Sequence, residues 1–167
     1  MPAKATHSPV AAGLYTPDQR ARRDATVWTL VQGILAPLQF IVFLVSLGLV
    51  LRYLATGLGY DAATWSIILK TAILLTIMVT GAIWEKVVFD QYLFAEAFFW
   101  EDVFSFAVIA LHLAYVYALL AGLSAGIQMW IALAAYAAYV VNAIQFVLKL
   151  RAARLQEQRL LQQEALA

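Results

Sequence analysis

The chain has 167 residues, of which 64% are hydrophobic and only 13% are charged, and its mean hydropathy is +0.80. Soluble domains carry about 25% charged residues, so this surplus of apolar surface indicates a protein that sits in lipid. The net charge of +1 leaves no basic face for nucleic acid, and the absence of cysteine excludes disulfides, thiolate chemistry and cysteine-ligated metals.

Residues 1–15, with two prolines and small polar side chains, are predicted to form a disordered tail. A helix is expected to begin near Pro17, because Thr16 can cap it and Gln19 completes a weak capping box. A single transmembrane domain, residues 16–155, should follow, and residues 156–167 form a helical tail. Its four apolar runs are each long enough to span a bilayer and cover about 27–54, 64–86, 99–121 and 127–149.

The predicted fold class is therefore all-α: an integral membrane four-helix bundle. Only a tight turn from Gly122 to Gly126 separates the last two runs, so these spans should be antiparallel neighbours. The connection over residues 86–98 is rich in aromatic and acidic side chains, which is typical of a segment lying along the membrane interface.

Positive charges predict the orientation of the bundle. The flanking segments carry most of them: Lys4, Arg20, Arg22 and Arg23 at the N-terminal end, and Lys149, Arg151, Arg154 and Arg159 at the C-terminal end. The first loop offers only Arg52 and Lys70. Because lysine and arginine are enriched in cytoplasmic segments, both termini and the 86–98 connection are predicted to be cytoplasmic.

Polar side chains recur on one face of each predicted span. The stripes are Gln32, Gln39 and Ser46; Thr71, Met78 and Glu85; Glu101, Ser105 and His112, with Asp102 and Tyr115 beside them; and Gln128, Asn142, Gln145 and Lys149. In an antiparallel bundle most of these residues fall in the cytoplasmic half. This convergence predicts an internal polar cavity open to the cytoplasm, because ionisable residues inside a membrane are candidates for function.

Each of these residues also has a purely structural interpretation. Glu85, Lys86, Glu101 and Asp102 lie at predicted helix ends, where charges are tolerated, and membrane-embedded Gln and Asn often only join helices. His112, close to mid-membrane, can hydrogen-bond a neighbouring helix, serve as an axial ligand to a metal tetrapyrrole, or donate a proton. The aromatic residues between 84 and 100 are typical of an interfacial belt but also leave room for a flat apolar ligand.

Four long stretches resemble one known family. They are WTLVQGILAPLQFIVFLVSLGLVLRYLATG, MVTGAIWEKVVF, QYLFAEAFFWEDVFS and YVVNAIQFVLKLRAARL. They resemble the 3-vinyl bacteriochlorophyllide hydratase family of phototrophic bacteria, whose older name is 2-vinyl bacteriochlorophyllide hydratase. The likeness runs from about Leu14 to Leu155. Asp90 and Glu96 depart from the family pattern, in which a small residue and a proline stand, and are therefore not candidates.

The resemblance implies hydration of the 3-vinyl group of chlorophyllide a or a bacteriochlorophyllide to a 1-hydroxyethyl group, on the branch that leads to bacteriochlorophyll a. It implies a multi-pass protein of the bacterial inner membrane, which is either the cytoplasmic membrane or the intracytoplasmic photosynthetic membrane. No cofactor is expected, because magnesium belongs to the tetrapyrrole substrate. The lipid bilayer is an expected partner and nucleic acid is not. A homo-oligomer, or association with other pigment-biosynthesis enzymes, is left open.

The product defines the chemistry. A hydroxyl on the inner vinyl carbon means that the proton goes to the terminal carbon, so the site needs a proton donor and a base for water. We expect Glu101 to be the donor and Asp102 or Glu85 to position the water. Adjacent helical residues point about 100° apart, so Glu85 with Glu101 is an alternative pair. His112 is expected over the substrate magnesium or as a second acid.

Substrate-binding residues are expected among the polar and aromatic side chains of the same half: Gln32, Gln39, Trp84, Lys86, Trp100, Ser105, Asn142 and Gln145. Lys86, Lys149 or Arg151 would hold the substrate propionate at the rim. Two other functions compete. A non-enzymatic pigment-binding or assembly protein would use His112 as an axial ligand and would need no acids. A transporter or channel would need polar residues on both sides, whereas the outer half looks nearly bare.

Overall fold

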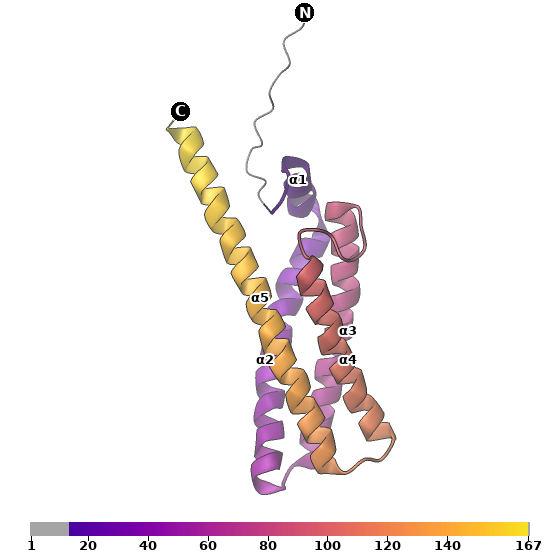
Figure 1. The fold of residues 1–167 in the computed structure, drawn as a ribbon. Coiled ribbons are helices and arrows are strands. Elements are labelled where there is room, and N and C mark those ends of the chain that lie inside the picture. Colours follow the sequence, from indigo (N-terminus) through magenta and orange to yellow (C-terminus); the bar gives the residue numbers. More distant parts are fainter. Residues whose placement is uncertain (1–13, 167) are drawn as a thin grey trace, which may run out of the picture.

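The computed structural model describes residues 14–166, which form five helices and no strand (Figure 1). The helices are α1 (Pro17–Ala25), α2 (Val27–Thr56), α3 (Tyr60–Phe89), α4 (Phe99–Leu120) and α5 (Ala125–Ala165). Of these, α2, α3, α4 and α5 are long and apolar enough to cross a membrane, which confirms the prediction of an all-helical protein with four spans. Residues 1–13 of the predicted tail, including Lys4, lie outside the described residues.

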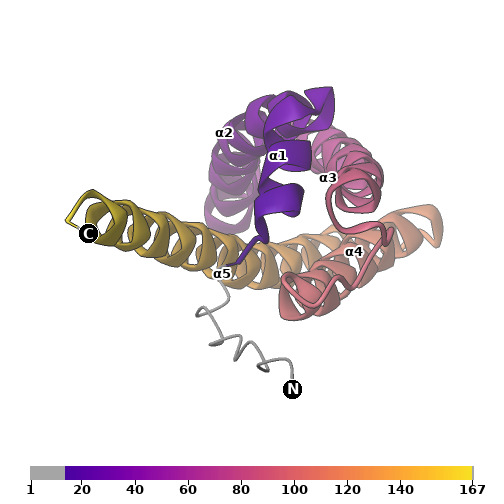
Figure 2. The same cartoon turned by 90° about the horizontal axis from the view of Figure 1, so that it is seen from above.

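The capping signals read from the sequence form as predicted at the start of α1. The backbone N–H of Gln19 donates to Thr16 Oγ1 at 3.3 Å, and Thr16 N–H donates to Gln19 Oε1 at 2.9 Å. Thr26 is extended and separates α1 from α2, and its hydroxyl accepts from Trp28 N–H at 3.3 Å. This break lets α1 turn away from α2 and pack against α3 at the end of the bundle (Figure 2).

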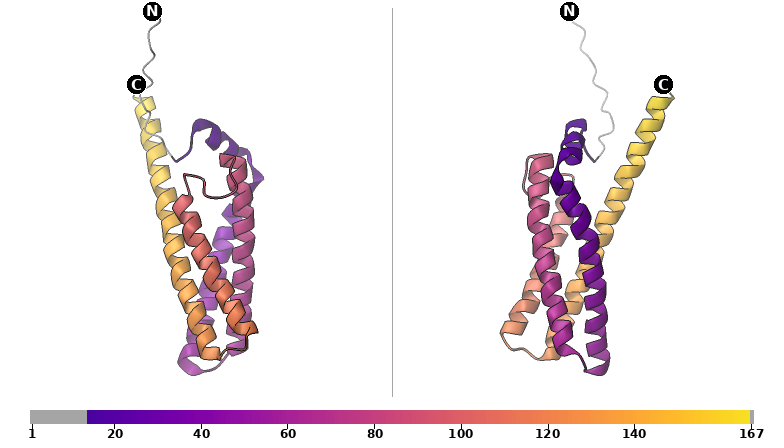
Figure 3. Two further views of the ribbon diagram at one scale, coloured as in Figure 1. Left: turned by 45° about the vertical axis from the view of Figure 1, so that its right-hand side comes forward. Right: turned by 180° about the vertical axis from the view of Figure 1, so that it is seen from behind.

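The bundle consists of two antiparallel helix pairs, because α2 packs along α3 and α4 packs along α5. Gly57 and Gly59, with φ of 71° and 87°, turn the chain between the first pair, in a conformation that glycine adopts without strain. The pairs meet near the turns, whereas α5 leans away from the other helices at the opposite end (Figures 1 and 3). This divergence opens the end of the bundle at which α1 lies.

The main core lies toward the turn end and includes Phe43, Met129 and Tyr136. Within it, the Tyr136 hydroxyl and Ser46 Oγ are 2.5 Å apart, and Ser46 Oγ is 2.6 Å from Ser66 Oγ. The sequence-based statement that this half is nearly bare of polar groups was therefore wrong. Each hydroxyl has a neighbouring-helix partner, as buried polar groups in a membrane require.

The outward faces of the four long helices are apolar. Ile34 is 59% exposed, Trp65 70% and Val147 63%, and these residues come from three different helices. Soluble proteins rarely expose such extended apolar surfaces. The side chains that point out of the bundle therefore suit contact with lipid.

Positive charge is unevenly distributed between the two ends. Among the lysines and arginines of residues 14–166, Arg52 is the only one exposed near the turns. Lys70, which the sequence analysis counted in the first loop, lies inside α3 and is completely buried. The loop assignment of Lys70 was wrong because Lys70 lies within the predicted apolar run itself, well past the start of α3 at Tyr60.

Lys70→Met is expected to raise the free energy of unfolding by about 1 kcal/mol. The Lys70 ammonium has no hydrogen-bond partner among the described residues, and its nitrogen lies 3.8 Å from the centroid of the Tyr139 ring. Removing a buried charge stabilises a protein, and the lost cation–π contact offsets part of that gain. Reversible unfolding in mixed detergent micelles measures the change, and a loss of stability would show that the ammonium is needed in the fold.

Candidate active site

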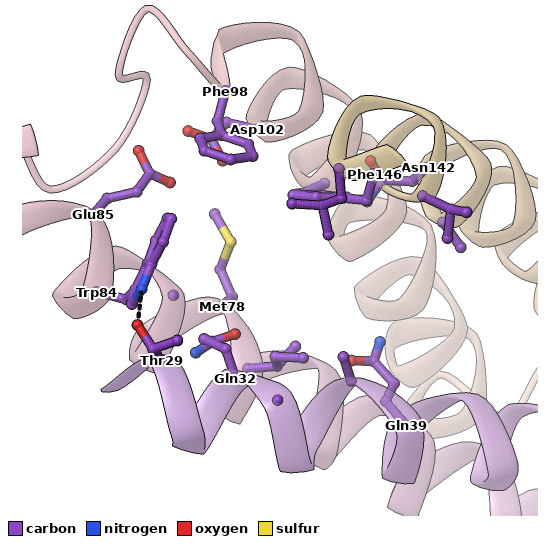
Figure 4. A pocket seen from close by; sticks show the side chains of 18 of the residues that line it. Thr29, Gln32, Gln39, Met78, Trp84, Glu85, Phe98, Asp102, Asn142 and Phe146 are labelled. Atoms are coloured by element: carbon purple, nitrogen blue, oxygen red, sulfur yellow. Dashed lines mark hydrogen bonds between the residues drawn. The ribbon is translucent and has the colours of Figure 1, made fainter. Parts of the chain in front are cut away.

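A cavity of about 1090 Å³ lies between the two helix pairs at the α1 end of the bundle (Figure 4). All five helices contribute to its wall, which is mainly apolar with polar groups at a few positions. Pockets for drug-sized ligands measure roughly 300–1,000 Å³. This cavity therefore has room for a larger molecule.

Two acidic side chains meet on the cavity wall. Glu85 comes from the C-terminal part of α3 and Asp102 from the first turn of α4. Both residues are buried, at 5% and 4% exposure, and their side chains interact with each other. Figure 4 shows the two carboxyls at the same end of the cavity. The cavity wall therefore carries a pair of acidic groups from two different helices.

The connection between α3 and α4 holds both acids in place. Phe94 N–H donates to Asp102 Oδ2 at 2.6 Å, and the next residue, Ala95, donates its N–H to Glu85 Oε2 at 3.3 Å. Phe94 has a φ of 59°, a left-handed conformation that is uncommon for a bulky residue. Such strain concentrates at functional sites, where the surrounding contacts maintain it. Here Phe94 is held by the bond to Asp102 and by Gln91 Nε2, which donates to the Phe94 carbonyl at 3.1 Å.

An aromatic wall stands beside the acid pair. The ring centroids of Trp84 and Phe98 are 5.7 Å apart, and those of Phe98 and Phe146 are 6.0 Å apart. The Trp84 indole N–H donates to Thr29 Oγ1 at 2.9 Å, which fixes the ring against α2. Flat rings held in this way offer stacking contacts to a planar conjugated ligand.

Amide side chains complete the polar part of the lining. Asn142 Nδ2 donates to Ser105 Oγ at 2.9 Å and joins α5 to α4, and Gln32 Nε2 donates to Thr80 Oγ1 at 2.8 Å. Asn142 Oδ1 is buried and accepts no hydrogen bond from the described residues. This oxygen is therefore available to a donor on a molecule in the cavity.

Comparison with known proteins assigns this chain to a family. A family model described as 2-vinyl bacteriochlorophyllide hydratase (BCHF) matches residues 15–152. The chain belongs to this family. A protein of Cereibacter sphaeroides named 2-vinyl bacteriochlorophyllide hydratase is 76% identical over 142 residues, which cover 85% of this chain and 89% of the relative. One of Rhodobacter capsulatus with the same name is 70% identical over 149 residues, covering 89% and 87%. No solved structure matches.

The catalytic candidates of this hydratase-family chain lie in different places. Glu85 and Asp102 line the cavity, whereas Glu101 and His112 do not. Glu101 Oε2 instead accepts from Lys149 Nζ at 2.5 Å. His112 is 1% exposed, and its Nδ1–H donates to the carbonyl of Val108 at 2.8 Å. The structure thus brings Glu85 together with Asp102, a pairing that the sequence analysis did not put forward.

The candidates for substrate binding also divide. Those on the cavity wall are Gln32, Gln39, Trp84, Ser105 and Asn142. Trp100 is 65% exposed and Gln145 lies elsewhere in the bundle, so neither contributes to the wall. Lys86 Nζ turns to Asp90 Oδ1 at 2.7 Å, outside the cavity.

Several lining residues escaped the sequence analysis, although helical spacing pointed to them. Thr29 is three residues before Gln32, and Phe146 is four residues after Asn142, so each pair shares a helix face. The backbone N–H groups of Phe94 and Ala95, which bond to the two acids, had no such signal, because a backbone donor is not marked by its residue type.

Proposed function

We propose that Glu85 and Asp102 form the acid–base pair with which this chain hydrates its substrate. The chain is a hydratase of bacteriochlorophyll synthesis, as the names of its relatives state. The proposed substrate is the 3-vinyl group of chlorophyllide a or of a bacteriochlorophyllide. The single observation that carries the assignment of residues is that these two interacting carboxyls line the cavity.

The reaction proceeds in two steps, protonation of the vinyl group and attack by water. The protonated carboxyl gives its proton to the terminal vinyl carbon, so the double bond becomes a methyl group beside a cationic inner carbon. The macrocycle π system stabilises that cation. A water oxygen then bonds to the inner carbon, and the ionised carboxyl takes the released proton, which gives the 1-hydroxyethyl group. Transfer of a proton between the two interacting carboxyls returns it to the first one, so the pair is ready for another turnover.

The surroundings give the two carboxyls different roles. Asp102 lies in the first turn of α4, where the helix dipole favours negative charge, and accepts a short bond from Phe94 N–H. Glu85 lies near the C-terminal end of α3, where the dipole has the opposite sign, and its bond from Ala95 N–H is longer. Asp102 is therefore the base that activates water, and Glu85 is the proton donor.

The shape of the cavity supports a tetrapyrrole as the substrate. Its volume of about 1090 Å³ exceeds that of ordinary ligand pockets, and the aromatic wall of Trp84, Phe98 and Phe146 suits a flat macrocycle. Hydration needs neither an oxidant nor a reductant, so the enzyme works without a cofactor of its own. Magnesium arrives with the substrate.

A pigment carrier that uses His112 as an axial ligand is the competing function. His112 Nε2 has no hydrogen-bond partner among the described residues, and its Nδ1–H is held by a carbonyl, which is the arrangement of a metal-binding imidazole. However, this nitrogen lies outside the cavity wall, and a carrier has no use for two interacting acids. The relatives are named hydratases, which favours the enzyme.

The positions of the arginines and lysines support an orientation of the bundle in the membrane. The α1 end of the bundle, where the cavity lies, also carries the described arginines and lysines except Arg52 and Lys70. Under the positive-inside rule this end faces the cytoplasm, in the inner membrane of a bacterium. Labelling of single cysteines at positions 52 and 154 from each side tests this orientation, since the chain has no cysteine of its own.

The function is tested in membranes of a host that lacks bacteriochlorophyll. Chlorophyllide a is added to membranes that contain the chain, and the pigment is analysed by mass spectrometry and absorption. A mass gain of one water, with the red band at shorter wavelength, is expected. Pigment that binds but keeps its vinyl group would identify a carrier instead.

A further inference from the structure

Charged side chains are segregated around the cavity. Among the described residues that line it, the charged ones are Arg20, Arg23, Glu85, Asp102 and Arg154. The two acids come from α3 and α4, whereas the arginines come from α1 and from the part of α5 that leans away. Figure 2 shows this part of α5 on the side of the bundle opposite α3 and α4. One wall is therefore acidic and the wall toward α1 and α5 is basic.

The basic wall is partly fixed by local contacts. Arg23 Nε donates to Asp24 Oδ1 at 2.7 Å, and its guanidinium lies 4.8 Å from the centroid of the Tyr15 ring. Tyr15 in turn stacks on Phe89 of α3, with ring centroids 5.8 Å apart. These contacts hold the end of α1 over the cavity and keep its arginines beside it. Arg154 reaches the same cavity from an exposed position on α5.

We infer that Arg20 and Arg154 bind the free propionate carboxylate of the tetrapyrrole and thereby turn its vinyl group toward Glu85 and Asp102. This inference rests on the proposed function. A guanidinium matches a carboxylate with two parallel hydrogen bonds, whereas an acidic wall repels it. The tetrapyrrole is a nearly round apolar disc, so stacking alone does not fix its rotation in the plane. Opposite charges on two walls do fix it.

Two further cations, Lys149 and Lys70, lie beside the cavity, and Lys149 is already paired with Glu101. Lys70 has no such acidic partner among the described residues. Its nitrogen lies 3.8 Å from the Tyr139 ring centroid, and Tyr139 is part of the cavity wall. However, Lys70 is completely buried, so a carboxylate would reach it only after Tyr139 moved. The basic wall needs no such movement, and it also leaves the carboxylate near water at the end of the bundle.

The inference predicts that the enzyme distinguishes a free acid from its ester. For the wild type, the methyl ester of chlorophyllide a should have a KM and a Kd about tenfold higher than the free acid, because a charged hydrogen bond is lost, and a lower kcat, because the rotation of the macrocycle is no longer fixed. The double variant Arg20→Gln/Arg154→Gln should raise both constants about tenfold for the acid and leave them unchanged for the ester. Arg159→Gln, on the same helix but outside the cavity wall, is the matched control and should behave as the wild type.

Equal constants for acid and ester in the wild type would overturn the inference, as would a double variant that weakens both ligands alike. If Lys70→Met lost the difference in Kd between acid and ester and the double variant kept it, Lys70 and not the arginines would be the residue that binds the carboxylate. The Kd, measured by titrating pigment absorption, separates this inference from the proposed function. If both substrates are hydrated and bound equally well, the role of the arginines is refuted and the proposed hydratase function stands. If the Kd differs between acid and ester but neither is hydrated, the hydratase function is refuted and the role of the arginines stands.

Discussion

Glu85→Gln and Asp102→Asn are each expected to lower kcat about 10²- to 10⁴-fold while the protein still binds chlorophyllide a. Glutamine and asparagine keep the size and polarity of the side chains but cannot pass a proton between them. Glu85→Gln removes the acid that protonates the terminal vinyl carbon, and Asp102→Asn removes the base that accepts the proton of water. The rate of product formation and the Kd of the pigment, measured on the same preparations, separate loss of chemistry from loss of binding.

Asp90→Asn is the matched control for these variants. Asp90 is also an acid near the α3–α4 connection, but it is exposed, and the hydrogen bonds of its side chain within the described residues go to Lys86 at the end of α3. Its replacement should leave kcat and Kd unchanged. A Glu85→Gln or Asp102→Asn protein that binds pigment and turns it over at the wild-type rate would contradict the assigned chemistry.

Glu101→Gln is expected to lower the free energy of unfolding by about 2 kcal/mol and to leave kcat within a few-fold of the wild type. Removing one partner of a buried ion pair costs about 3–5 kcal/mol, and the effect is smaller here because the Lys149 side chain is 25% exposed. The bond between Glu101 and Lys149 joins α4 to α5 beside the cavity, so its role is to hold these helices together.

The double variant Glu101→Gln/Lys149→Met also tests whether the Glu101–Lys149 ion pair has a structural role. It removes both charges at once, so it should recover most of the stability that Glu101→Gln loses. Unfolding in mixed micelles and turnover are measured for all three proteins. If Glu101→Gln slowed turnover about a hundredfold or more without loss of stability, Glu101 would return to the role of proton donor.

The helices could be predicted from the sequence because their signals are local. Apolar runs of sufficient length, the Thr16–Gln19 capping box and the glycines at 57 and 59 each depend on neighbouring residues only. The start of α3 was placed at residue 64 instead of Tyr60, because Asp61 interrupts the apolar pattern without interrupting the helix. Lys70 was counted with the first loop although it lies inside the predicted span, because its charge suggested a helix end.

The composition of the site was harder to predict, because it depends on how the helices rotate about their axes. Helical periodicity placed Glu101 and Asp102 on one helix end but did not decide which of them faces α3. The structure turns Asp102 to Glu85 and Glu101 to Lys149, and the bond from Phe94 N–H to Asp102 fixes this choice. A left-handed Phe94 has no sequence signal, so neither the loop nor the pair could be derived beforehand.

The central claim is most directly tested by product analysis of the double variant Glu85→Gln/Asp102→Asn, with Glu101→Gln beside it. Each protein is loaded with chlorophyllide a, and the bound pigment is examined by mass spectrometry over many wild-type turnover times. We predict that the double variant holds the pigment with its mass unchanged, and that Glu101→Gln adds one water. A double variant that adds water at the wild-type rate, or unchanged pigment in Glu101→Gln alone, would contradict the account.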